Sequence, residues 1–151
     1  MCRFRILALA LAAGTLQGFW LAPLRAEVLI TEQEARRPAA ERKATEAARG
    51  IFRAPKIHLL SPAEGEATSP INLKLKFESF GGTKIDQDSI KIIYLKSPLV
   101  DLTPRLMRHL KNNAIDLGVA EVPPGEHRLK VEVKDSDGRL GTADFILKVA
   151  K

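Results

Sequence analysis

Residues 122–149 constrain the fold more than any other stretch, because two runs of strict alternation flank one Asp-Gly pair. Apolar or imidazole side chains recur at every second position of both runs: His127, Leu129, Val131, Val133, Ala143, Phe145, Leu147 and Val149. A period of two places such side chains on one face of a strand. Asp137-Gly138 separates the runs, and glycine accepts the positive φ that a tight hairpin turn requires. The segment therefore predicts a β-hairpin with one buried face.

Four further stretches show the same period and predict strands at residues 56–60, 71–77, 89–96 and 115–119. Residues 89–96 carry apolar side chains on both faces, which indicates a more central place in a sheet. About six or seven short strands separated by turn signals are typical of a β-sandwich. We therefore expect residues 55–151 to form one all-β domain, an antiparallel sandwich with Greek-key connections.

The closing hairpin resembles that of bacterial immunoglobulin-like domains, the broad group that includes fibronectin-III-like and cadherin-like modules. The resemblance rests on PPGEH at 123–127, KVEVKD at 130–135, SDGR at 136–139 and TADFILKV at 142–149. In that comparison His127 stands where the family often carries a tyrosine near the start of the penultimate strand. The resemblance implies an immunoglobulin-like sandwich but no particular activity, because this fold hosts many unrelated functions.

The amino-terminal residues 1–26 have the three-part pattern of an export signal. MCRFR is a short basic region, residues 6–24 form an apolar run, and Ala26 suits the position before a cleavage site. We expect cleavage after Ala26, which places the protein in the periplasm or outside the cell with no membrane span left. The alternative is an uncleaved anchor, because the apolar run is almost long enough to cross a bilayer.

Charge and cysteine usage narrow the function classes. Loss of the signal removes three arginines and no acidic residue, and so halves the formal net charge of +6. The remaining basic residues stand singly along predicted strands without interleaved aromatic residues, which argues against nucleic-acid binding. The single cysteine, Cys2, lies in the signal, so the exported chain has no disulfide and its core must hold by packing.

Residues 27–54 are rich in Ala, Arg and Glu and predict a charged tail, partly helical or disordered. Thr31 and Glu34 have capping-box spacing, and Pro38 should end that helix. A second helix is expected at 39–49, as a charged spacer or as a helix that orders on a partner. The apolar residues 28–30 are the exception, because they could pair as an edge strand or dock on the domain.

Residues 98–113 interrupt the alternation and predict a short helical insert. We expect Thr103 as the N-cap, Pro104 at the first helical position, and Leu106, Met107 and Leu110 facing the sandwich. Asn112-Asn113 should end the insert. Arg105 is expected to be solvated or paired locally, and a polar contact site around residues 100–105 is the alternative.

The sequence shows no nucleophile, zinc-protease, CxxC or phosphate-loop motif, and we expect no catalysis and no cofactor. His58, His109 and His127 are too far apart in sequence to form a local metal motif, although a sandwich could gather them. Residues 57–77 look somewhat like the start of periplasmic copper-carrier sandwiches, but the Met-rich and amino-terminal His ligands of that group are absent. Asp135, Asp137 and Gly138 suit either a hairpin turn or, less well, part of a calcium loop.

These observations predict an exported, single-domain immunoglobulin-like module that binds another exported or envelope protein or serves a structural role. Sheet edges are one place for such an interaction, because an exposed edge can accept an added strand. The helical insert at 98–113 is the other. A periplasmic carrier of a copper-type metal on the same fold is the alternative function. The sequence leaves the partner and the oligomeric state open.

Overall fold

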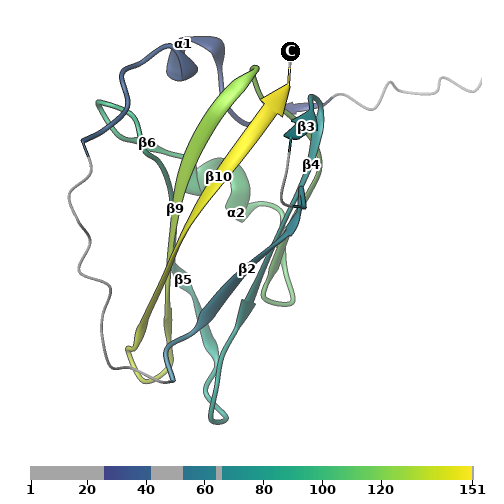
Figure 1. The fold of residues 1–151 in the computed structure, drawn as a ribbon. Helices are drawn as coiled ribbons and strands as arrows, with labels where there is room; N and C mark the ends of the chain where they lie inside the picture. The colour runs from purple at the N-terminus through teal and green to yellow at the C-terminus, as the bar shows by residue number, and fades with distance from the viewer. Residues whose placement is uncertain (1–25, 42–52, 64–65, 151) are drawn as a thin grey trace, which may run out of the picture.

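The computed structural model describes residues 26–41, 53–63 and 66–150, and strands make up most of its elements (Figure 1). In chain order these elements are β1 (Glu27–Val28), α1 (Glu32–Ala35), β2 (Lys56–Ser61), β3 (Glu66–Thr68), β4 (Ile71–Glu78), β5 (Ile85–Tyr94), β6 (Val100–Asp101), α2 (Thr103–Met107), β7 (Leu110–Lys111), β8 (Ala114–Glu121), β9 (Gly125–Asp135) and β10 (Leu140–Ala150). The predicted signal lies outside the described residues except for Ala26. The predicted helix at 39–49 also lies outside them, except for residues 39–41, which are not helical.

The described strands form two sheets, consistent with a β-sandwich. One sheet has the order β1-β8-β4-β2, with β7 also paired to β8, and the other has the order β3-β10-β9-β5-β6. Most pairs are antiparallel, but β1 runs parallel to β8 and β3 runs parallel to β10. Both sheets are therefore mixed, which corrects the expectation of a purely antiparallel sandwich. The two parallel strands have only 2 and 3 residues, too few for a period to be recognised in the sequence.

The core is built from the alternating apolar side chains of both sheets. In β4, Ile71, Leu73, Leu75 and Phe77 are buried and the residues between them are more exposed. The buried residues of β5, β9 and β10 belong to the same apolar cluster. Within the described residues, every buried side-chain nitrogen and oxygen has a hydrogen-bond partner. A core of this kind needs no disulfide, because each buried aliphatic or aromatic side chain contributes ~1.5–3 kcal/mol.

The predicted hairpin is confirmed as β9 and β10, which pair antiparallel along almost their whole length. Leu129, Val131, Val133 and Leu147 are buried on its inner face. Gly138 has a φ of 76° in the connecting turn, a backbone conformation that glycine adopts without steric cost.

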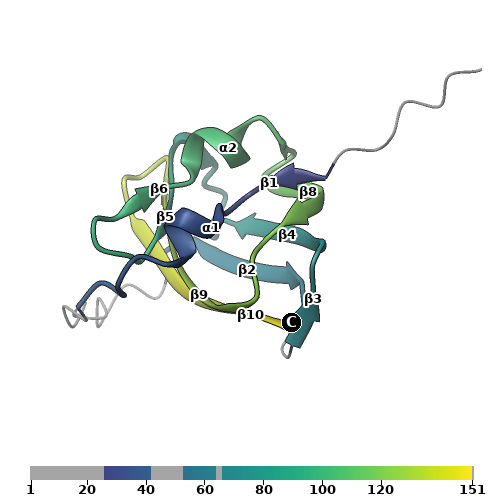
Figure 2. The same ribbon diagram turned by 90° about the horizontal axis from the view of Figure 1, so that it is seen from above.

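The apolar residues 28–30 dock on the sandwich, so the amino-terminal end of the predicted tail is part of the folded structure. Glu27 and Val28 pair with Ala120 and Glu121 of β8, and Leu29 and Ile30 are buried in the core. The predicted capping box is present at α1, where the Thr31 hydroxyl accepts from the backbone N–H of Glu34 and the Glu34 carboxylate accepts from that of Thr31. Figure 2 shows α1 and β1 near α2, and an ion pair joins Glu34 of α1 to Arg105 of α2.

The predicted helical insert is confirmed as α2, although its first residues differ from the expectation. Leu102, not Thr103, is the N-cap, because the Thr103 hydroxyl accepts from the backbone N–H of Ile92 in β5. Asn112 and Asn113 have positive φ and form the turn between β7 and β8. The insert is therefore a single helical turn followed by a short hairpin.

Candidate interaction site

Two strand edges lie side by side with no strand paired to them among the described residues. The edge of β2 away from β4 is open along the strand, and the edge of β10 away from β9 is open before Lys148, where β3 begins to pair. Figure 1 shows β2 running beside β10. The space between the two edges, called the seam here, is a groove of about 540 Å³ lined by Ile57–Leu60 and Asp144–Leu147 among other residues.

The alternating hydrogen bonds of an antiparallel ladder identify which backbone groups face the seam. The N–H of Leu95 donates to the carbonyl of Arg128, so the backbone groups of Arg128 point toward the chain of β5. The other even-numbered residues of β9 point the same way, whereas its odd-numbered residues form their backbone hydrogen bonds with β10. The backbone groups of Asp144 and Ile146 therefore point away from β9 and into the seam.

The same reasoning applies to β2. The N–H of Phe77 donates to the carbonyl of Asn113, so the odd-numbered residues of β4 bond toward β8. Ile57 stands opposite Phe77 and Leu59 opposite Leu75, so the backbone groups of Ile57 and Leu59 also face the seam. The seam thus presents donors and acceptors from two strands.

A second groove, of about 800 Å³, lies over the outward face of the β10-β9-β5 sheet. We call it the face groove. Alternation along these strands, continued by one residue beyond the end of β5, turns six side chains into it: Ile93, Leu95, Arg128, Lys130, Asp144 and Ile146. It shares Asp144, Phe145 and Ile146 with the seam. The two grooves therefore meet along β10 and form one continuous surface.

The face groove combines exposed apolar groups with charges that lack ion-pair partners among the described residues. Ile146 is 49% exposed and Leu99 is 58% exposed. Lys130 is paired with Glu132 at 2.8 Å, whereas neither Arg128 nor Asp144 takes part in any ion pair of the described chain. A partner with complementary charges would pair with the positive Arg128 and the negative Asp144, beside exposed apolar side chains.

The amino-terminal segment, residues 26–41, forms one wall of the face groove through residues 38–41. The N–H of Ala40 donates to the carbonyl of Leu95 at 3.2 Å, and that of Ser97 donates to the carbonyl of Pro38 at 2.9 Å. These bonds fasten residues 38–40 to the chain that follows β5, so the segment shapes the surface that a partner would meet.

An ion pair between Arg105 of α2 and Glu34 of α1 anchors this segment. The guanidinium donates to both carboxylate oxygens, at 2.7 and 3.0 Å, and to the carbonyl of Leu29 at 2.7 Å. The hydrogen bonds from Arg105 and Thr31 outweigh burial and lower the pKa of Glu34 to about 2. The prediction that Arg105 would be solvated or locally paired is wrong, because its partners lie far away in the sequence.

His127 is buried near the start of β9 and contacts two partners. Its Nε2 lies 2.7 Å from the carbonyl of Pro123 and its Nδ1 lies 2.8 Å from the hydroxyl of Tyr94. The carbonyl of Pro123 can only accept, so Nε2 carries a proton and donates it there. Burial raises the pKa of Tyr94 to about 12. Burial also lowers the pKa of His127, which favours the neutral ring, in which Nδ1 accepts from the Tyr94 hydroxyl.

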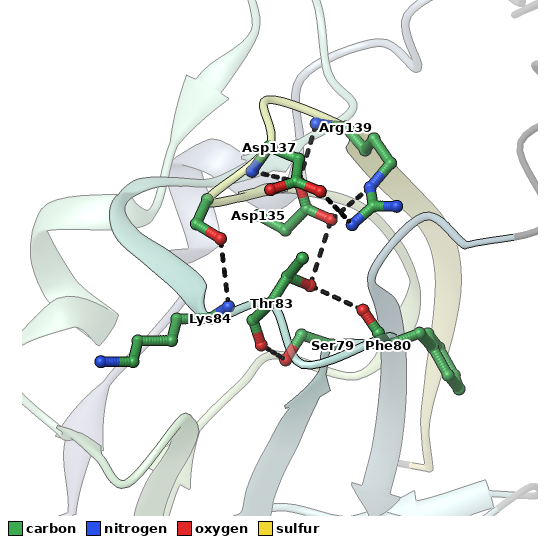
Figure 3. A network of polar contacts seen from close by, with 8 residues as sticks. Ser79, Phe80, Thr83, Lys84, Asp135, Asp137 and Arg139 are labelled. Carbon is green, nitrogen blue, oxygen red and sulfur yellow. Dashed lines mark hydrogen bonds and ion pairs between the residues drawn. The ribbon is translucent and has the colours of Figure 1, made fainter.

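Asp135 organises the hairpin turn (Figure 3). Its carboxylate accepts from the backbone N–H groups of Asp137 and Arg139 at 3.0 and 2.9 Å, and from Nε of Arg139 at 2.7 Å. Burial alone would raise the pKa of Asp135, but these hydrogen bonds lower it. Thr83 also lies within 3.5 Å of the carboxylate. The Asp-Ser-Asp-Gly sequence is thus engaged in turn chemistry.

The structure places each of the three histidines with a different partner. His58 contacts Glu78 at 3.2 Å on the exposed side of β2, and His109 contacts Glu27 at 2.8 Å. His127 is buried and contacts Tyr94 and Pro123. In the described part of the chain, no group of three or more His, Cys, Asp or Glu side chains could hold a metal ion. The metal-carrier alternative therefore gains no ligand set from these residues.

No family model, curated protein or solved structure matches this chain. Among the described residues, no helix is both long enough and apolar enough to cross a membrane. The sequence directed attention to sheet edges in general, whereas the face groove was not predicted. The apolar residues on both faces of 89–96 were its only sequence signal, because they include Ile93 and Leu95.

Proposed function

We propose that this protein is an exported immunoglobulin-like module that binds another exported or envelope protein and performs no catalysis. The face groove and the seam together form the binding surface. The export signal at 1–26, with cleavage after Ala26, gives the location: the periplasm, or the outside of the cell.

The strand order supports the immunoglobulin-like assignment. β2, β4 and β8 share one sheet while β5, β9 and β10 share the other, as strands A, B, E and C, F, G do in immunoglobulin domains. His127 supports it as well. It stands near the start of the penultimate strand and bonds to the carbonyl of Pro123, four residues upstream, as the corner tyrosine of that fold bonds to upstream backbone.

The observation that carries the binding proposal is the face groove itself. It is about 800 Å³ in volume and is lined by apolar side chains together with a few charged ones. The exposed Ile146 lies across from Arg128 in the β9-β10 ladder. Arginine is among the residues enriched at the centres of protein interfaces, and Arg128 lies there beside exposed apolar surface.

Site-specific photocrosslinking in the producing cell tests this proposal. The photoreactive residue benzoylphenylalanine replaces Ile146 in one variant and Val119 in a control variant. Val119 is a matched control, because it is 42% exposed against 49% for Ile146 and lies on β8 of the other sheet. We expect one discrete protein adduct at position 146 and none at 119.

A charge reversal, Arg128→Glu, supplies the second arm. The adduct at position 146 should fall at least tenfold in this background, because the partner loses its complement to the arginine. Equal adducts at 146 and 119, or an adduct at 146 that is indifferent to Arg128→Glu, would refute the face groove as the binding surface.

A further inference from the structure

We infer that the partner docks by strand addition, placing an extended segment in the seam against the open edge of β10. This inference rests on the proposed binding function and specifies the chemistry of the partner. The occupant is a stretch of another exported protein with apolar side chains at alternate positions. Hydrogen bonds of its main chain provide the affinity, and its apolar side chains provide the specificity for the seam.

The backbone of β10 provides the first argument. Asp144 and Ile146 turn their N–H and carbonyl groups toward the seam, and no described strand pairs with them. The same edge already accepts a parallel strand two residues further on, where β3 pairs with Lys148–Ala150. An added strand would therefore continue, toward Leu140, a ladder that the fold has already begun.

The side chains that line the seam provide the second argument. Ile57 and Leu59 of β2 and Phe145 of β10 are partly buried hydrophobic residues packed against the core, and Leu147 is buried. In an added strand, every second side chain would point inward onto these groups. These side chains line the groove at the border between the two sheets, so an apolar side chain that enters the seam would extend the existing core.

The ends of the seam limit the length of the occupant. A methyl group on Gly141 would collide with the carbonyl oxygen of Pro55, so the backbones of the chain before β2 and of β10 are in contact there. At the other end, Pro62 and Ala63 line the groove just before β3. The open edge between Gly141 and Lys148 measures about 20 Å at ~3.4 Å per residue, which fits a segment of about five or six residues.

The outward-facing side chains of the added segment would lie beside a charged and an exposed apolar side chain of β10. These two are Asp144, which has no ion pair among the described residues, and the exposed Ile146. A lysine or arginine next to Asp144 and an apolar residue next to Ile146 complement this row. The expected segment therefore alternates apolar residues on its inner side and carries one basic residue on its outer side.

A display library of random nine-residue peptides, selected on the purified chain, tests the inference. We expect enrichment of alternating apolar peptides with a basic residue on the opposite face. Ile146→Pro removes the seam-facing N–H, and proline is tolerated at such edge positions. It should weaken peptide binding by about two- to tenfold more than Ile146→Ala, which removes only the side chain, because one backbone hydrogen bond is lost.

Amide exchange of the wild-type chain makes the test independent of how well the proline variant folds. A selected peptide should slow exchange at Asp144 and Ile146 at least tenfold. Peptides that bind without protecting these amides, binding that is equal in the Pro and Ala variants, or no enriched peptide at all would overturn strand addition. Self-association without peptide that Ile146→Pro abolishes would also overturn it, because a second copy would then be the occupant. If strand addition fails while the adduct at position 146 forms, the binding function stands.

Discussion

The ion pair between Glu34 and Arg105 should hold the amino-terminal segment on the sandwich. Bonds from Arg105 and Thr31 lower the pKa of Glu34 from 4.5 to about 2, and each pKa unit corresponds to ~1.36 kcal/mol. The ionised carboxylate therefore contributes about 3 kcal/mol to the stability of the docked segment. Because the folded pKa is depressed, this contribution is complete above pH 4.5 and is lost as the pH falls toward 2.

Glu34→Gln mimics the protonated carboxyl group, so it should remove most of that contribution at pH 7. Glu32→Gln is the matched control on the same helix, because its pair with Arg36 is exposed and should be worth under ~0.5 kcal/mol. Unfolding in urea, followed by circular dichroism, measures global stability. Exchange of the Leu29 amide, which donates to Glu121, measures local detachment of the segment.

The gap between wild type and Glu34→Gln should close between pH 4.5 and 2, because the wild-type carboxylate then becomes protonated. Equal losses for Glu34→Gln and Glu32→Gln in both measurements at pH 7 would refute the anchoring role of Glu34. A gap that stays constant down to pH 2 would refute the proposed origin of its stability.

Three further predictions concern the hairpin and its contacts with the rest of the sandwich. Asp135→Ala should cost about 1–3 kcal/mol in urea unfolding, because it leaves backbone N–H groups of the turn unpaired; an unchanged midpoint would contradict its role. His127→Phe should cost a similar amount at pH 7.5 because it leaves a buried hydroxyl unpaired. The depressed pKa of His127 makes the wild type lose stability as the pH falls below 6.5. The difference in unfolding free energy between wild type and His127→Phe should therefore shrink by pH 5. A difference that grows would be inconsistent with a neutral ring. Gly141→Ala should lower the melting temperature because its methyl group meets the carbonyl of Pro55, whereas Gly118→Ala has open space and should have little effect; equal effects would argue against the close contact.

Local patterns predicted much of the fold. The alternation in 122–149 gave the hairpin, and the spacing of Thr31 and Glu34 gave the capping box of α1. Pro104 and the missing alternation gave the insert, and α2 is found there. These features depend on residues close together in the chain, whose side chains fix the backbone locally.

Contacts between residues far apart in the sequence explain why the predictions for Thr103, Arg105 and the antiparallel sheets were wrong. The Thr103 hydroxyl bonds to Ile92 on a neighbouring strand, so it cannot cap its own helix. Arg105 meets Glu34, which is 71 residues away, and no pattern in the sequence signals such a pair. β1 and β3 are too short to show a period, so the parallel pairs were not foreseen.

The seam was equally hidden from the sequence. Alternation identifies the faces of β2 and β10, but which strand edges stay open depends on the sheet order. The register of Leu95 with Arg128 then determines that Asp144 and Ile146 face the seam.

Residue-resolved amide exchange of the free protein tests the open edge most directly. If the seam is open, the amides of Asp144 and Ile146 should exchange quickly, because no described strand offers them a backbone acceptor. Those of Phe145 and Leu147 should exchange slowly, because they donate to β9. The alternation of fast and slow amides along one strand is the predicted result. Slow exchange at all four residues would show that the edge is already covered, and would contradict a surface that is free to accept a partner strand.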